Sequence, residues 1–142
     1  MEILRGISIL FLLTLPILSL AGEPTLVVHK SNPVTSLNLT EARNIFLGKK
    51  VFWNNGDSIE VFLQDKGEIH KTFALKTLGK SPRQLTMYWK RVLFSGEGIP
   101  PRKAANDHEM LELVAGNAKA IGYIDHEFID NRIKAVAIIR EE

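Results

Sequence analysis

Segments with the pattern of a buried strand alternate with segments with the pattern of an amphipathic helix, and this alternation constrains the fold most. Residues 25–30 (TLVVHK) are a short, β-branched apolar run bounded by polar residues, as in a buried strand. Residues 38–49 then carry apolar side chains at helical spacing. Later segments continue the alternation, and the chain closes with two apolar runs at 120–124 and 133–139. We therefore expect an α/β fold in which helices pack on a central sheet.

Local signals indicate where the helices begin. Asn38, Ser81 and Asn106 each precede an apolar helical pattern and have the short polar side chain that caps a helix N-terminus. Pro82 suits the first helical position after Ser81. Residues 96–104 (GEGIPPRKA) hold two glycines and two consecutive prolines, so we expect an irregular loop there.

The first residues predict export. Ile7 to Leu20 form an apolar stretch of signal-peptide length, shorter than the roughly 20 residues of a membrane-spanning helix. Ser19-Leu20-Ala21 has the small-x-small pattern that signal peptidase accepts. We therefore expect residues 1–21 to be a cleaved signal peptide and residues 22–142 to be one periplasmic domain without a membrane span. The alternative is that the stretch is kept as an N-terminal anchor.

Composition limits how the mature chain can fold and what it can bind. The 142 residues suffice for one domain but not for two well-filled ones, and they include no cysteine, so no disulfide supports the fold. The net charge is +2 and no run of five or six basic residues occurs, which does not support nucleic-acid binding.

A polar bend in residues 62–79 (FLQDKGEIHKTFALKTLG) is the clearest candidate site. The segment runs from the end of a strand into a helix, with Gly67 at the bend and Lys66, His70 and Lys71 around it. The first N–H groups of a helix lack partners and carry partial positive charge, so such a bend can hold an anion.

Several motifs, in their order along the chain, resemble the second lobe of phosphate-binding proteins from ABC importers. The pattern is I-F-x-G-K, a tryptophan, a strand, a glycine loop and finally an I-G-Y segment. The matching residues are Ile45, Phe46, Gly48, Lys49, Trp53, Gly67, Gly116, Ile121, Gly122 and Tyr123. Residues 81–101 (SPRQLTMYWKRVLFSGEGIPP) further resemble a small, single-lobe subgroup of exported phosphate-binding-like proteins.

The resemblance implies a single lobe of the type II periplasmic-binding-protein fold, with a small mixed sheet flanked by helices. It also implies binding of phosphate or another small oxyanion, without a cofactor, and an ABC permease as a partner. The loop chemistry departs from the family, however. The family's arginine falls on Gln64, and its serine-glycine-threonine run falls on Glu68-Ile69-His70.

Two interpretations of the bend stay open. Lys66, His70 and Lys71 can replace the missing arginine, with Gln64 contributing polar contacts and Ser31 and Asn32 lining the same edge of the sheet. Alternatively, the three basic residues are solvated side chains on an exposed turn. His70 is the best candidate for a pH-sensitive contact because it is the only histidine near the bend.

Other chemistry has weaker support in the sequence. His108 and Glu112 have i, i+4 spacing on a predicted helix, but no third metal ligand is visible. Trp53, Tyr88, Trp89 and Tyr123 fit core positions better than a stacking platform. The serines have no histidine–acid partner at a recognisable spacing, so an enzyme is not expected.

The sequence thus predicts a phosphate-binding-like lobe that acts by binding. The alternative is an envelope accessory module that has kept the lobe, lost the ligand, and contacts a protein partner through residues 94–107 (FSGEGIPPRKAAND).

Overall fold

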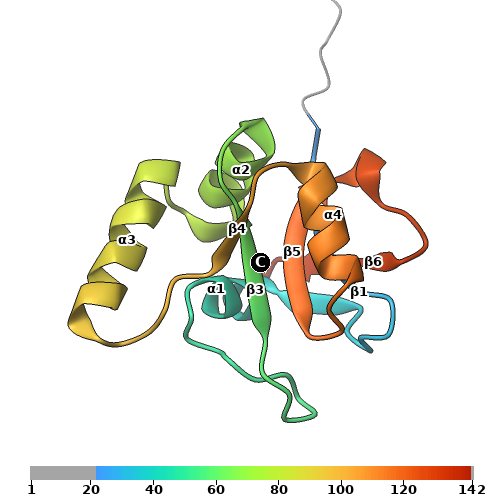
Figure 1. The fold of residues 1–142 in the computed structure, drawn as a ribbon, viewed down its shortest axis with the longest axis horizontal. Coiled ribbons are helices and arrows are strands. Elements are labelled where there is room, and N and C mark those ends of the chain that lie inside the picture. Colours follow the sequence, from blue (N-terminus) through green and yellow to red (C-terminus); the bar gives the residue numbers. More distant parts are fainter. Residues whose placement is uncertain (1–21, 142) are drawn as a thin grey trace, which may run out of the picture.

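The computed structural model describes residues 22–141, which form a mixed sheet with helices on both faces (Figure 1). The predicted signal peptide lies outside the described residues. The strands are β1 (Pro24–His29), β2 (Ser36–Asn38), β3 (Glu60–Gln64), β4 (Arg102–Ala104), β5 (Ala120–Asp125) and β6 (Ile133–Ile139). The helices are α1 (Leu39–Phe46), α2 (Glu68–Phe73), the π-helical η1 (Ala74–Leu78), α3 (Pro82–Ser95), α4 (Asp107–Ala115) and the short 3₁₀ helix η2 (His126–Phe128). The predicted α/β fold is confirmed.

The six strands are ordered β2-β6-β1-β5-β3-β4. β1 runs antiparallel to both β5 and β6, whereas β3 runs parallel to both β5 and β4. The C-terminal ends of β3, β4 and β5 therefore meet at one edge of the sheet, meaning the edge formed by the strand ends. The C-terminal end of β1 lies at the opposite edge. This polarity decides which loops can share a site.

The expectation of a fully irregular loop at residues 96–104 is wrong in part. Arg102–Ala104 forms β4, which pairs with Phe62–Gln64 at the free edge of β3. This strand has only three residues and no β-branched side chain, so backbone hydrogen bonds hold it to β3. No apolar pattern in the sequence predicts such a strand.

Two cores cover the two faces of the sheet, because successive side chains of a strand point in opposite directions. On one face Leu26 and Val28 of β1 pack with aromatic residues of the helices, including Phe46, Phe73 and Trp89. On the other face Val27 packs with α4 through residues such as Met110 and Val114. The interpretation of Trp53, Trp89 and Tyr123 as core residues is confirmed, since all three are buried, and Tyr88 is half-buried.

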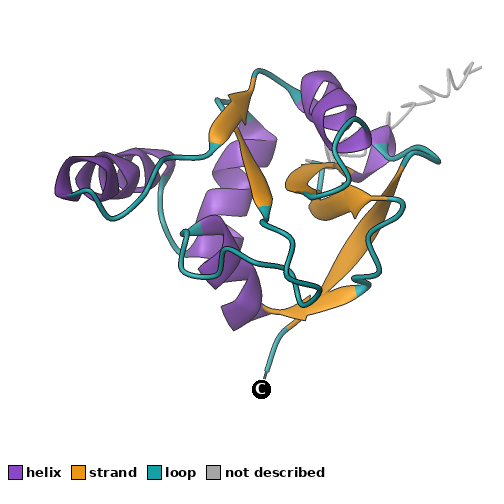
Figure 2. Cartoon of the chain, turned by 60° about the horizontal axis from the view of Figure 1, so that its bottom comes forward, coloured by secondary structure: helices purple, strands orange, loops and turns teal. Residues whose placement is uncertain are grey.

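Three of the helices begin at the predicted caps. The side chains of Asn38, Ser81 and Asn106 accept hydrogen bonds from the backbone N–H groups of Glu41, Gln84 and Glu109, respectively. Ser81 and Gln84 complete a reciprocal capping box. α3 then extends along one side of the molecule, apart from the other helices (Figure 2).

No helix within residues 22–141 is long and apolar enough to cross a membrane.

Candidate anion-binding site

The Gly67 bend joins the C-terminal end of β3 to α2. Gly67 has φ 99° and ψ 174°, a backbone conformation that favours glycine, and a Cβ atom added there would meet nothing within 4 Å. Its carbonyl accepts a hydrogen bond from the Lys71 N–H group, which closes the first turn of α2. The bend is therefore well defined and open to solvent.

The N-terminus of α2 has no side-chain cap, unlike those of α1, α3 and α4. Within residues 22–141, the backbone N–H groups of Glu68, Ile69 and His70 donate to no acceptor. Glu68 is exposed, and its carboxylate does not fold back to cap the helix. Three consecutive donors consequently remain available at the bend.

The charges beside these donors are mixed. Lys66 and Lys71 are exposed and form no ion pair within the described part of the chain. Asp65 lies 3.9 Å from the ammonium group of Lys103 on β4, where both side chains are about half exposed. No ion pair within the described residues therefore holds the two lysines of the bend.

The side chain of Gln64 points away from solvent. It is 3% exposed, and its Nε2 donates to Asp107 Oδ1 at 2.6 Å and to the Tyr123 carbonyl at 3.0 Å. Its backbone N–H donates to the Tyr123 hydroxyl at 2.8 Å. Gln64 therefore stabilises the end of β3 from within, and a ligand at the bend would have to compete for its amide.

His70 is also buried, so its interpretation as a solvated side chain is wrong. Only 6% of the residue is exposed, and its Nδ1 lies 2.6 Å from the Tyr123 hydroxyl. The same hydroxyl accepts from the Gln64 N–H group, and whether it donates its own proton to Nδ1 depends on the tautomer of the imidazole. Burial and the nearby Lys103 ammonium lower the pKa of His70, while Asp65 opposes the shift. Burial also raises the pKa of Tyr123, which keeps the hydroxyl protonated.

Ser31 and Asn32 do not lie at the same edge as Gly67, so that part of the prediction is wrong. They follow the C-terminal end of β1, which is antiparallel to β5 and therefore lies at the opposite edge of the sheet. Asn32 is buried and its Oδ1 accepts from the Val34 N–H group, which stabilises a turn. Ser31 contacts His29 Nδ1 at 2.7 Å. Both residues border a separate surface depression near Trp53.

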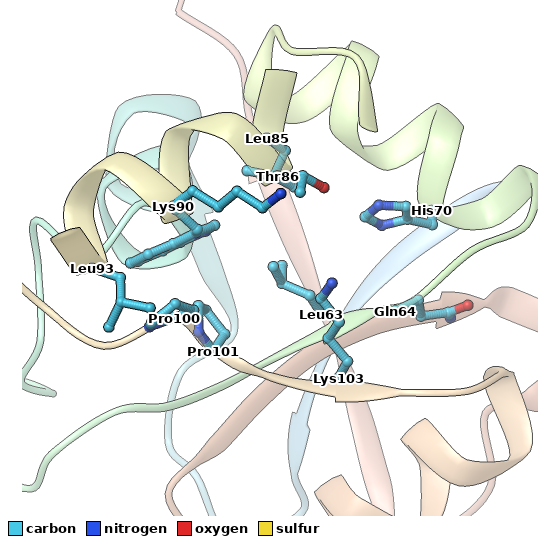
Figure 3. A pocket seen from close by; sticks show the side chains of 11 residues that line it. Leu63, Gln64, His70, Leu85, Thr86, Lys90, Leu93, Pro100, Pro101 and Lys103 are labelled. Atoms are coloured by element: carbon cyan, nitrogen blue, oxygen red, sulfur yellow. The ribbon is translucent and has the colours of Figure 1, made fainter. Parts of the chain in front are cut away.

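A cavity of about 170 Å³ lies between α3 and the edge formed by β3 and β4. Its walls are mainly apolar and include Leu63, Leu85 and Trp89. The His70 ring points toward this space from α2, and Lys103 borders it from β4 (Figure 3). The Nε1 atom of the buried Trp89 has no hydrogen-bond partner within the described residues, so packing beneath α3 is incomplete.

The metal interpretation of His108 and Glu112 gains no support from the geometry. No group of three potential ligands occurs within residues 22–141. Glu112 instead accepts two hydrogen bonds from Arg132, whose guanidinium also contacts Asp130. These contacts hold the pKa values of both carboxyl groups below their usual range.

Tyr123 and Asp107 are the residues whose roles the sequence did not reveal. Tyr123 belongs to the I-G-Y segment, but only the structure shows that its hydroxyl joins Gln64 to His70. Asp107 comes from the start of α4, and its carboxylate receives hydrogen bonds from Gln64 Nε2 and the Asp125 N–H group. Each contact joins residues far apart in the sequence, so no local spacing could predict it.

No protein-family model matches the sequence, and no curated protein matches it in a sequence search. Solved structures match it clearly, however. A protein from Clostridium perfringens, described as a phosphate ABC transporter substrate-binding protein and solved with bound phosphate, matches 82% of this chain with a TM-score of 0.65 and 25% identity. An ABC-type phosphate transport receptor from Vibrio cholerae matches 81% with a TM-score of 0.64 and 21% identity. PstS from Borrelia burgdorferi matches 82% with a TM-score of 0.59 and 14% identity.

The chain has the fold of a phosphate-binding-protein lobe. The match covers 45%, 45% and 47% of those three proteins, so the chain spans less than half of their length. That extent is consistent with one lobe of a larger protein, as the sequence motifs imply. In this chain the Gly67 bend lies at the C-terminal end of β3, and Gln64 and His70 are turned inward, toward Tyr123.

Proposed function

We propose that this chain is an exported, non-catalytic binding protein that holds phosphate or another small oxyanion at the Gly67 bend. The proposal rests on the uncapped N-terminus of α2. The backbone N–H groups of Glu68, Ile69 and His70 would donate to the oxyanion, and Lys66 and Lys71 would balance its charge. The likeness to a phosphate-bound protein of the same fold supports this ligand class.

The affinity should be modest. Within the described residues the bend is open to solvent, and the family's arginine position is occupied by Gln64, whose amide is already engaged. Residues 1–21 would direct the chain to the periplasm, where an ABC permease is the partner that the resemblance implies.

A thermal-shift titration with phosphate, sulfate and chloride at equal ionic strength tests the proposal. A ligand that binds only the folded state at ten times its dissociation constant adds about 1.4 kcal/mol to the free energy of unfolding. We expect a saturable rise of the melting temperature with phosphate or sulfate and none with chloride.

The double variant Lys66→Ala/Lys71→Ala should weaken this effect by roughly tenfold or more in dissociation constant. The matched control Lys119→Ala/Lys134→Ala removes the same charge elsewhere. Equal responses of the two double variants would place the anion away from the bend.

A protein- or surface-interaction role is the second candidate function. Phe94 and Ile99 are 86% and 85% exposed, and both lie in residues 94–107, the segment that the sequence singled out as a contact loop. They are the two most exposed large apolar residues within residues 22–141, so a partner that covered them would bury apolar surface.

A further inference from the structure

α3 differs from the other helices in how little of it is covered. It lies at one side of the molecule in both views (Figures 1 and 2), and it buries only Leu85 and Trp89. Beneath the helix, Trp89 Nε1 has no hydrogen-bond partner within the described residues, and a cavity lies between α3 and the sheet.

The outer face of α3 carries cations and apolar side chains but no acid. At 3.6 residues per turn, Arg83, Met87, Arg91 and Phe94 fall within one sector opposite Leu85 and Trp89. All four are exposed, and Lys80, Arg83, Met87 and Arg91 border one shallow surface depression. Phe94 ends the row, and Ile99 follows in the next loop.

Charge is unevenly distributed along the chain. Residues 80–103 contain six basic residues and one acid, Glu97, whereas the rest of the chain contains 12 basic and 15 acidic residues. Within residues 22–141, neither Arg83 nor Arg91 forms an ion pair. This segment therefore presents a positive surface on a chain whose remainder is slightly negative.

We propose that the outer face of α3, with Phe94 and Ile99 at its end, binds the surface of an anionic lipid bilayer. Lysine and arginine can keep their charged groups at the level of the lipid phosphates while neighbouring apolar side chains enter the acyl boundary. Cationic and apolar side chains alternate in the order Arg83, Met87, Arg91 and Phe94, so both kinds of contact with the bilayer are available along this face.

A dry protein interface suits this face less well. Its apolar residues are interrupted by two guanidinium groups, which such an interface would have to remove from water. A second copy of this chain is also disfavoured, because pairing two α3 helices would oppose like charges.

Vesicle co-sedimentation tests the proposal. The chain from Gly22 onward, which contains every described helix and strand, is mixed with vesicles of phosphatidylcholine alone or with phosphatidylglycerol added. We expect binding only to the anionic vesicles, and weaker binding as salt rises, because screening shortens the reach of the cations.

Two variants and two controls locate the surface. Phe94→Ser and the double variant Arg83→Gln/Arg91→Gln should each lower the vesicle partition coefficient by roughly tenfold. Phe128→Ser alters another exposed phenylalanine, in η2, and Lys119→Gln/Arg140→Gln removes the same charge away from α3. These controls should bind as the parent chain does, and circular dichroism spectra should show that all four variants fold.

The proposal would be overturned by absent binding to anionic vesicles, or by equal effects of the variants and their controls. Binding to soluble polyglutamate without binding to vesicles would also overturn it, since that result would point to an acidic polypeptide. Phosphate binding at the Gly67 bend is tested with variants of Lys66 and Lys71, which are not changed in the vesicle experiment. Either proposal can therefore fail without the other.

Discussion

At the residue scale, the Tyr123 hydroxyl joins the end of β3 to α2. It accepts from the Gln64 N–H group and contacts His70 Nδ1, and its ring stacks on Phe73 with centroids 3.7 Å apart. All of these groups are buried. A buried donor that loses its acceptor cannot recover a hydrogen bond from water, so this small network should matter more for stability than its number of bonds suggests.

Tyr123→Phe should lower the free energy of unfolding by about 1–3 kcal/mol, because it leaves the Gln64 N–H group without an acceptor. The control Tyr88→Phe removes a 2.6 Å hydrogen bond to the Leu47 carbonyl at a half-buried position and should cost about 0.5–1.5 kcal/mol. Urea unfolding measures both values. A loss for Tyr123→Phe no larger than that for Tyr88→Phe would contradict this role.

His70 should make the folded state less stable in mildly acidic solution. Its pKa in the folded chain is lowered below 6.5, mainly by burial. As the pH falls below 6.5, the unfolded chain therefore takes up a proton that the folded chain resists, and the free energy of unfolding decreases.

Urea unfolding between about pH 5.5 and 7, above the usual range of carboxyl groups, measures this slope. His70→Gln should reduce the slope, and the same change at the exposed His126 serves as the matched control. An identical slope in the parent chain and His70→Gln would show that another group is responsible.

At the scale of elements, the close contact of the Trp89 side chain with the turn after α1 depends on Gly48. Its φ is 75°, and a Cβ atom there would lie 2.8 Å from Trp89 Cη2. Gly56 has φ 91° but would meet nothing within 4 Å. Both glycines thus have a left-handed backbone conformation, but only Gly48 has a side chain close to the position of an added Cβ atom.

Gly48→Ala should therefore destabilise the chain more than Gly56→Ala. Each substitution should cost about 1–2 kcal/mol for the left-handed backbone. Gly48→Ala should cost about 1 kcal/mol or more in addition, because Trp89 must move within the core. Equal losses in urea unfolding would mean that Trp89 shifts freely beneath α3.

The predicted elements agree with the structure where a local pattern specifies them. Caps such as Ser81 and apolar strands such as residues 133–139 could be recognised from neighbouring residues alone. β4 could not, because its pairing depends on the free edge of β3 rather than on its own side chains.

The site was harder to predict for the same reason. Gly67 and the exposed lysines follow from the bend, whereas the burial of His70 depends on Tyr123, 53 residues away in the sequence. The misplaced Ser31 and Asn32 show the importance of strand direction, which the residues after β1 do not reveal.

At the scale of the whole molecule, the chain has the fold of one lobe and matches 45% of two of the solved proteins that it resembles. The Gly67 bend and α3 belong to different parts of that lobe, at a sheet edge and at the side of the molecule. The proposed oxyanion site and the proposed bilayer-binding face therefore use different residues of one small domain.

An amide-resolved NMR titration with phosphate can locate a bound anion at single residues of the Gly67 bend. The backbone N–H signals of Glu68, Ile69 and His70 should shift most and should saturate together, while chloride at equal ionic strength leaves them in place. Unchanged signals at these three residues up to millimolar phosphate, or larger saturable shifts elsewhere, would contradict a site at the Gly67 bend.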